Sequence, residues 1–174
     1  GHGPLADPKD KLRVFTAVTA AGEMVIKERF AVAATALELA LREEPQIPQA
    51  LLLLATCYKE MGRIEEAKAK LDLLLKETPD NTQALITLAN ILIDEGKNDD
   101  VIAFCKQTLS VDERNTQAFT LLGQAYMGKK EPAEALPYFE KAFEIQPKIT
   151  RSRLDLAVCL LNLKRYDRAE TELK

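Results

Sequence analysis

The feature that most constrains the fold is an internal repeat with a period of 34 residues. Segments that begin at Pro48, Thr82 and Thr116 align without a gap, and the period extends back to Val14 and forward to Thr150. A period of this length is typical of solenoids, in which each unit buries its apolar face only against its neighbours. Counting places from the first residue of each unit, the sequence predicts repeats at 14–47, 48–81, 82–115, 116–149 and a truncated 150–174.

Residues at fixed places predict that each repeat is a pair of helices, helix A followed by helix B. Small residues occupy the eighth place on helix A and the twentieth place on helix B, and large apolar residues occupy the places between them. Small residues facing large ones at helical spacing let two apolar stripes interdigitate. The eighth place holds Ala21, Ala55, Ala89, Gly123 and Ala157, and the twentieth holds Ala33, Ala67, Val101, Ala135 and Ala169.

Helix ends are marked by residues with a known preference for them. Three prolines, at positions 45, 79 and 147, occupy the thirty-second place, just past helix B, where proline cannot continue a helix. Asn81 and Asn115 precede the next helix A and can cap it through a side-chain oxygen. Gly62 and Gly96 lie at the turn between helices A and B, where repeat one has no glycine. Upstream, Asp7-Pro8 predicts a first helix that begins near Pro8, after a flexible tail at 1–7.

These residues and spacings resemble the tetratricopeptide repeat family over residues 14–174. The resemblance implies an all-α fold of antiparallel helix pairs stacked into a right-handed superhelix, with helix A lining a concave groove. A weaker resemblance covers about ten residues, PLADPKDKL from Pro4 to Leu12, and is to the connector that follows the catalytic domain in some bacterial sulfatase-like proteins with appended repeats. It implies a parent chain with an enzyme domain before Gly1.

The residues that catalysis would need are not present in a usable arrangement. The only histidine is His2, in the predicted tail, so no Ser-His-Asp or Cys-His system has a placed base. No phosphate-binding glycine motif occurs, and Asp94 to Asp100 lacks the spacing of a calcium loop. Adjacent carboxylates such as Glu65 and Glu66 point about 100° apart on a helix. We expect no catalytic residues, no cofactor and no metal.

Charge and composition narrow the class of partner. The formal net charge is −3 and no segment gathers Lys and Arg into a stripe, so we expect no nucleic acid. The longest apolar run, Ala50 to Ala55, is far too short for a membrane span. Cys57, Cys105 and Cys159 are odd in number and widely spaced, which indicates buried thiols in a reducing compartment and favours a cytoplasmic location.

The predicted groove carries apolar and neutral polar residues, mainly amides, rather than charges. Some members of the tetratricopeptide repeat family bind chaperones through a clamp of Lys and Asn side chains. In this sequence, the places of the clamp's basic residues hold uncharged residues in both possible registers: Leu52, Gln117 and Leu121 in one, and Val18, Gln83 and Thr87 in the other. We therefore expect a scaffold that binds an extended peptide or a partner domain; the alternative is a structural or oligomerising spacer within a larger enzyme. The predicted groove residues are Gln49, Leu52, Thr56, Gln83, Ile86, Asn90, Gln117, Thr120, Gln124 and Met127.

The last repeat is expected to be incomplete. Its helix B reaches Lys174 midway, and a repeat array buries its terminal apolar face only under a capping unit. The sequence therefore predicts that Leu156, Leu160 and their neighbours are partly uncovered. Self-association through this end, or fraying of the final helix, is expected.

Overall fold

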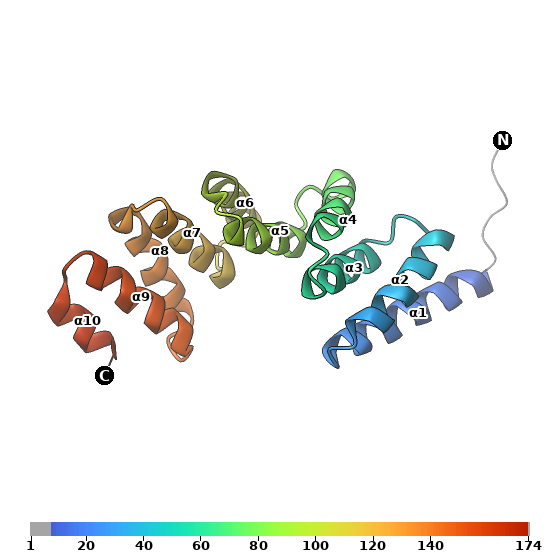
Figure 1. The fold of residues 1–174 in the computed structure, drawn as a ribbon, viewed down its shortest axis with the longest axis horizontal. Helices are drawn as coiled ribbons and strands as arrows, with labels where there is room; N and C mark the ends of the chain where they lie inside the picture. Colours follow the sequence, from blue (N-terminus) through green and yellow to red (C-terminus); the bar gives the residue numbers. More distant parts are fainter. Residues whose placement is uncertain (1–7, 174) are drawn as a thin grey trace. The chain divides into compact units, whose positions relative to one another are not determined.

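The computed structural model describes residues 8–173, and all the regular secondary structure in that range is α-helix. The five predicted A/B pairs are all present, and helix A of the first pair begins at Pro8 as the sequence indicates (Figure 1). The predicted tail at 1–7, with His2 and Asp7, lies outside the described residues. The helices are α1 Pro8–Ile26, α2 Phe30–Glu43, α3 Pro48–Glu60, α4 Ile64–Glu77, α5 Thr82–Asp94, α6 Asn98–Val111, α7 Thr116–Gly128, α8 Pro132–Ile145, α9 Thr150–Asn162 and α10 Tyr166–Leu173.

The chain divides into two compact units. Unit 1 is Gly1–Pro79 and contains α1 to α4, and unit 2 is Asp80–Lys174 and contains α5 to α10. Within each unit every helix packs on the next one along the chain (Figure 1). The A helices of successive repeats also touch, α1 with α3 in unit 1, and α5 with α7 and α7 with α9 in unit 2. Each unit is therefore a stack of antiparallel helix pairs, as in a tetratricopeptide-type α-solenoid.

The small residues lie where the helix pairs come closest. All five residues of the twentieth place are fully buried, and those of the eighth place are buried in every repeat. Gly123 is the tightest of these positions, because a Cβ atom there would lie 2.5 Å from Cε1 of Phe139 on α8. The prediction of small residues against large ones is confirmed.

Every turn from helix A to helix B uses the same backbone conformation. Gly62 and Gly96 have φ of 76° and 72°, and the equivalent residues Glu28, Lys130 and Lys164 also have positive φ, of 55°, 63° and 58°. The hydrogen bonds repeat as well: in repeat two, the N–H groups of Arg63 and Gly62 donate to the carbonyls of Tyr58 and Lys59. This is the Schellman arrangement, which satisfies the last carbonyls of a helix. Repeat one thus forms the standard turn without a glycine.

The two predicted asparagine caps are confirmed. The side-chain oxygens of Asn81 and Asn115 accept hydrogen bonds from the N–H groups of Ala84 and Ala118, each at 2.9 Å. These bonds satisfy N–H groups of the first turn, which have no partner within the helix. Helices α3 and α9 begin after isoleucines instead and have no side-chain cap.

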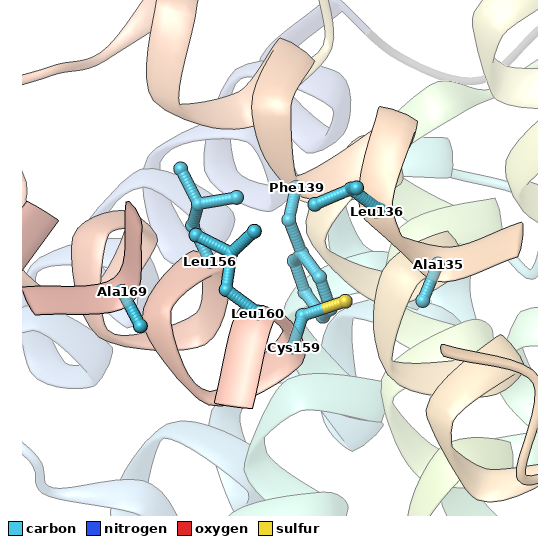
Figure 2. Close-up of a cluster of buried hydrophobic side chains, with 7 residues drawn as sticks. All are labelled: Ala135, Leu136, Phe139, Leu156, Cys159, Leu160 and Ala169. Atoms are coloured by element: carbon cyan, nitrogen blue, oxygen red, sulfur yellow. The ribbon is translucent and has the colours of Figure 1, made fainter. Parts of the chain in front are cut away.

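The prediction that Leu156, Leu160 and their neighbours are partly uncovered is wrong for the two named leucines, although the neighbouring Leu154, Val158 and Leu161 are exposed. Leu156 and Leu160 are 1% and 0% exposed, and they belong to a buried cluster that includes Phe139 of α8 and Ala169 of α10 (Figure 2). Their places on helix A face the preceding helix B and the helix B of their own repeat. Their burial therefore does not depend on any repeat that would follow.

Candidate functional site

The polar face of unit 2 lies on two neighbouring A helices, α5 and α7. Gln83 and Gln117 occupy the second place of their repeats and are exposed, and Asn90 and Gln124 occupy the ninth place and are half-buried. Because α5 and α7 are in contact, amides at equal places belong to adjacent helices on one side of unit 2. Four of the ten predicted groove residues are thus amides with accessible surface in this unit.

Three of these four amides are not engaged elsewhere within the described part of the chain. Asn90 donates from Nδ2 to the carbonyl of Ile86 at 2.9 Å, a bond within its own helix, and its Oδ1 accepts none. The side chains of Gln83, Gln117 and Gln124 form no hydrogen bond with any residue in 8–173. Donors and acceptors on this face are therefore available to a ligand.

The predicted apolar contacts offer less surface than the sequence indicates. Leu52 and Ile86 are only 9% and 5% exposed, so both contribute mainly to the packing of their own units. Met127 is half-buried and packs against the buried cluster of α8, α9 and α10. The groove assignment as a whole stays a prediction, with the amides as its most accessible part.

The remaining predicted groove residues differ in exposure and in hydrogen bonding. The hydroxyls of Thr56 and Thr120 donate to the carbonyls of Leu52 and Thr116, four residues earlier on the same helix, each at 3.0 Å. Gln49 is exposed on α3 in unit 1. The threonines thus direct their donors back to the backbone, whereas Gln49 presents its amide to solvent.

Unit 1 contains an apolar groove, and Gln49 is the one predicted groove residue that lines it. The groove is a hollow of about 690 Å³ between α1 and the start of α3. Its wall along α1 follows the helical spacing from Lys11 through Val18 and Gly22 to Ile26, and Ile47 and Leu53 close the other side. We call this hollow the α1/α3 groove.

Two exposed residues give the α1/α3 groove its character. Phe15 is 69% exposed and Ile26 is 83% exposed, and both line the hollow. Phe15 occupies the second place of repeat one, where the next three repeats have glutamine. This departure is visible in the sequence once the second place is followed back to the first repeat. It was the signal that could have located the groove.

A family model for the tetratricopeptide repeat protein 21 C-terminal ARM domain matches residues 5–171. The chain belongs to this family. The match runs through both units and all five helix pairs, in agreement with the ungapped period. A comparison with curated proteins finds no match.

Solved structures of tetratricopeptide repeat proteins share the fold. MamA 41-end from Desulfovibrio magneticus RS-1 superposes with a TM-score of 0.83 at 17% identity, covering 97% of this chain and 93% of that one. Pseudomonas aeruginosa PilF gives 0.85 at 17% identity, covering 94% and 75%. TTC0263, a thermophilic TPR protein of Thermus thermophilus, gives 0.74 at 22% identity, covering 91% and 87%. None of these comparisons supports the sulfatase resemblance or the spacer alternative.

Metal-ligating clusters and free thiols are two kinds of reactive group to consider among the described residues of this repeat-family member. Within residues 8–173, no three His, Cys, Asp or Glu side chains gather in a way that could hold a metal ion. The three cysteines are buried free thiols, and burial raises the pKa of each, that of Cys105 to about 12. A thiol with a raised pKa is protonated at neutral pH and is a poor nucleophile. In the same range, no helix is long and apolar enough to cross a membrane.

Tyr58 is a buried polar group of unit 1 whose contacts indicate a structural role. Tyr58 of α3 donates its hydroxyl to Oε1 of Glu38 on α2 at 2.7 Å, and the guanidinium of Arg63 lies 4.1 Å from the centroid of the tyrosine ring. Burial, followed by the hydrogen bond to Glu38, raises the pKa of Tyr58 to about 12. Arg63 also pairs with Glu66 on α4. These contacts join three helices of unit 1 and give the tyrosine a packing role.

Proposed function

We propose that the chain is a non-catalytic scaffold that binds an extended, largely uncharged polypeptide segment across α5 and α7. The observation that supports this most is the pair of matched amides: Gln83 with Gln117, and Asn90 with Gln124. Amide side chains carry both donors and acceptors, so they can bond the backbone of a peptide whatever its sequence. Their repetition on neighbouring helices suits a long ligand more than a point charge.

Each contact of this kind is weak, so binding requires several of them together. Each neutral hydrogen bond contributes about 0.5–1.5 kcal/mol net, so four amides supply a modest affinity. Half-buried Met127, at the twelfth place of α7, adds apolar contact beside the amides. Because no ion pair is involved, the affinity should depend only weakly on salt.

The experiment uses a displayed library of random twelve-residue peptides as the probe. Peptides selected on the wild-type chain are synthesised, and their affinities are measured by calorimetry for wild type, Asn90→Ala and Gln124→Ala. We expect each substitution to weaken binding about 2–10-fold, because each removes one hydrogen-bonding group of about 0.5–1.5 kcal/mol. The selected peptides should be poor in charged residues.

Gln146→Ala is the matched control. Gln146 is an exposed amide of unit 2 that follows α8 and lies outside α5 and α7. Its substitution should leave binding unchanged, and circular dichroism should show that all variants stay folded. Selection of strongly charged peptides, or equal affinities for wild type and both amide variants, would contradict the proposal.

A further inference from the structure

Helix α9 of unit 2 carries an exposed apolar stripe. Leu154, Val158 and Leu161 are 49%, 42% and 44% exposed and follow the spacing i, i+4, i+7, which aligns them along one side of the helix. They occupy the fifth, ninth and twelfth places of repeat five. Ile86, at the fifth place of α5, has α7 beside it and is only 5% exposed. The stripe on α9 is therefore an apolar helix face that lacks a covering helix within the described residues.

The α1/α3 groove of unit 1 is shaped to receive a helix of this kind. Its wall on α1 runs from Lys11 to Ile26, a rise of roughly 22 Å at 1.5 Å per residue. Helix α9 has 13 residues and is therefore roughly 20 Å long. Gly22, in the second half of the wall, has no side chain that would hold the docked helix away. The groove presents exposed Phe15 and Ile26 to an apolar stripe.

The charges at the two surfaces are complementary. Glu23 and Glu44 line the groove, together with Lys11, and neither carboxylate forms an ion pair with any side chain the structure describes. Lys164 and Arg165 follow the end of α9, are exposed, and likewise have no ion pair among the described residues. The groove thus has an excess of negative charge, and the end of the stripe has an excess of positive charge.

We propose that α9 of one copy docks into the α1/α3 groove of a second copy. Leu154, Val158 and Leu161 then cover Phe15 and Ile26, while Lys164 and Arg165 approach the free carboxylates. The two surfaces differ, so the contact is heterologous: each copy keeps one unused groove and one unused stripe. Such contacts propagate head to tail rather than stopping at a dimer. The contact involves none of the four amides of α5 and α7.

The first measurement is sedimentation equilibrium of the wild-type chain from about 1 μM to about 1 mM, the range over which weak contacts become populated. The weight-average mass should rise above the 19.4 kDa of a monomer and continue past that of a dimer. Added salt should lower it, because the charges at the contact are partly exposed. A mass that stays at 19.4 kDa throughout overturns the proposal.

Two substitutions each disable one surface. Phe15→Lys places a cation in the groove, and Val158→Glu places a carboxylate in the middle of the stripe. Each should weaken association about 30-fold or more, as expected for an anchor residue at the centre of a contact. Leu154→Glu is the second stripe variant, because it alters the most exposed of the three residues and disturbs folding least.

Mixing the two variants separates this contact from any symmetric one. The Phe15→Lys copy keeps its stripe and the Val158→Glu copy keeps its groove, so the mixture should form a 1:1 dimer with wild-type affinity and grow no further. Leu12→Lys and Val111→Glu are controls, since both residues are exposed and apolar but lie outside the two surfaces. A mixture that stays monomeric, or controls that associate as poorly as the variants, would overturn the proposal.

Discussion

Repeat two in unit 1 and repeat four in unit 2 build the same helix pair from different residues. Repeat two places Ala55 against a helix that carries Leu71 at its twenty-fourth place, whereas repeat four places Gly123 against Phe139. The first combination divides the volume more evenly, and the second combines the smallest residue with a large ring. All four residues are buried. The period therefore determines which places of helices A and B pack together. The fold constrains the total volume of the side chains at those places rather than the identity of each residue.

The surfaces of the two units differ more than their interiors. Unit 1 presents an apolar groove beside Phe15, and unit 2 presents amides at the equivalent places. Interior places must satisfy packing in every repeat, but a surface place is constrained only by what binds there. The difference at the second place is for this reason the better guide to function.

The largest effect on stability is expected from changing the packing between Gly123 and Phe139 in repeat four. Gly123→Ala would place a Cβ atom 2.5 Å from the ring of Phe139. Overpacking of this kind costs about 1–3 kcal/mol. The gain from removing a helical glycine, about 0.5–1 kcal/mol, offsets only part of it. Urea unfolding should show a net loss of stability.

The double variant tests whether volume is the cause. Phe139→Leu alone leaves a cavity, but Gly123→Ala with Phe139→Leu recreates the pairing of repeat two. The double variant should be more stable than the sum of the single effects by about 1 kcal/mol or more, as expected for residues in contact. Ala55→Ser in unit 1 serves as a control that leaves both residues of repeat four untouched. Strictly additive effects would show that the two residues are not coupled.

Most of the fold follows from the sequence because the period repeats every local signal. The helix pairs, the small residues at the eighth and twentieth places and the caps at Asn81 and Asn115 could all be predicted. The prediction for Leu156 and Leu160 was wrong because it assumed that these side chains would be covered by a following repeat. These residues are covered instead by α8 and α10, and three-dimensional packing was needed to see which neighbour covers which place.

The candidate site was only partly predictable for a physical reason. Amides such as Gln117 could be identified because their type and spacing are periodic. Leu52 and Ile86 could not be recognised as largely buried, since the fifth place is exposed on one helix and covered on another according to which helix lies beside it. The α1/α3 groove depends on a departure from the period at Phe15, and a search for repetition overlooks departures.

A smaller effect is expected at the turn between helices A and B. Gly62 and Lys130 occupy the same place with φ of 76° and 63°. A residue with a side chain pays about 1–2 kcal/mol for this left-handed conformation. Gly62→Lys should therefore lower the free energy of unfolding by about 1 kcal/mol, and Lys130→Gly should raise it by about the same amount, because the freedom that glycine adds to the unfolded chain offsets part of the strain in both cases. Thermal unfolding would measure both changes, and shifts of the same sign for the two variants would contradict this account.

The smallest effect is expected at the start of helix A, where the repeats differ again. Asn115 caps α7, while Ile149 precedes α9 at the equivalent place with a similar backbone, φ −84° and ψ 113° against −67° and 102°. Asn115→Ala should cost about 1 kcal/mol, since one N–H of the first turn loses its partner. Ile149→Asn should raise the free energy of unfolding by about 0.5 kcal/mol. The added cap stabilises α9, and the loss of the isoleucine's contacts offsets part of this gain, although that side chain is 44% exposed. Thermal unfolding and hydrogen exchange at the N–H of Ser152 would measure both changes. If Ile149→Asn leaves that exchange as fast as in wild type, the asparagine has not formed the bond, and the backbone at the start of α9 differs from that of α7 in a way that two dihedral angles do not capture.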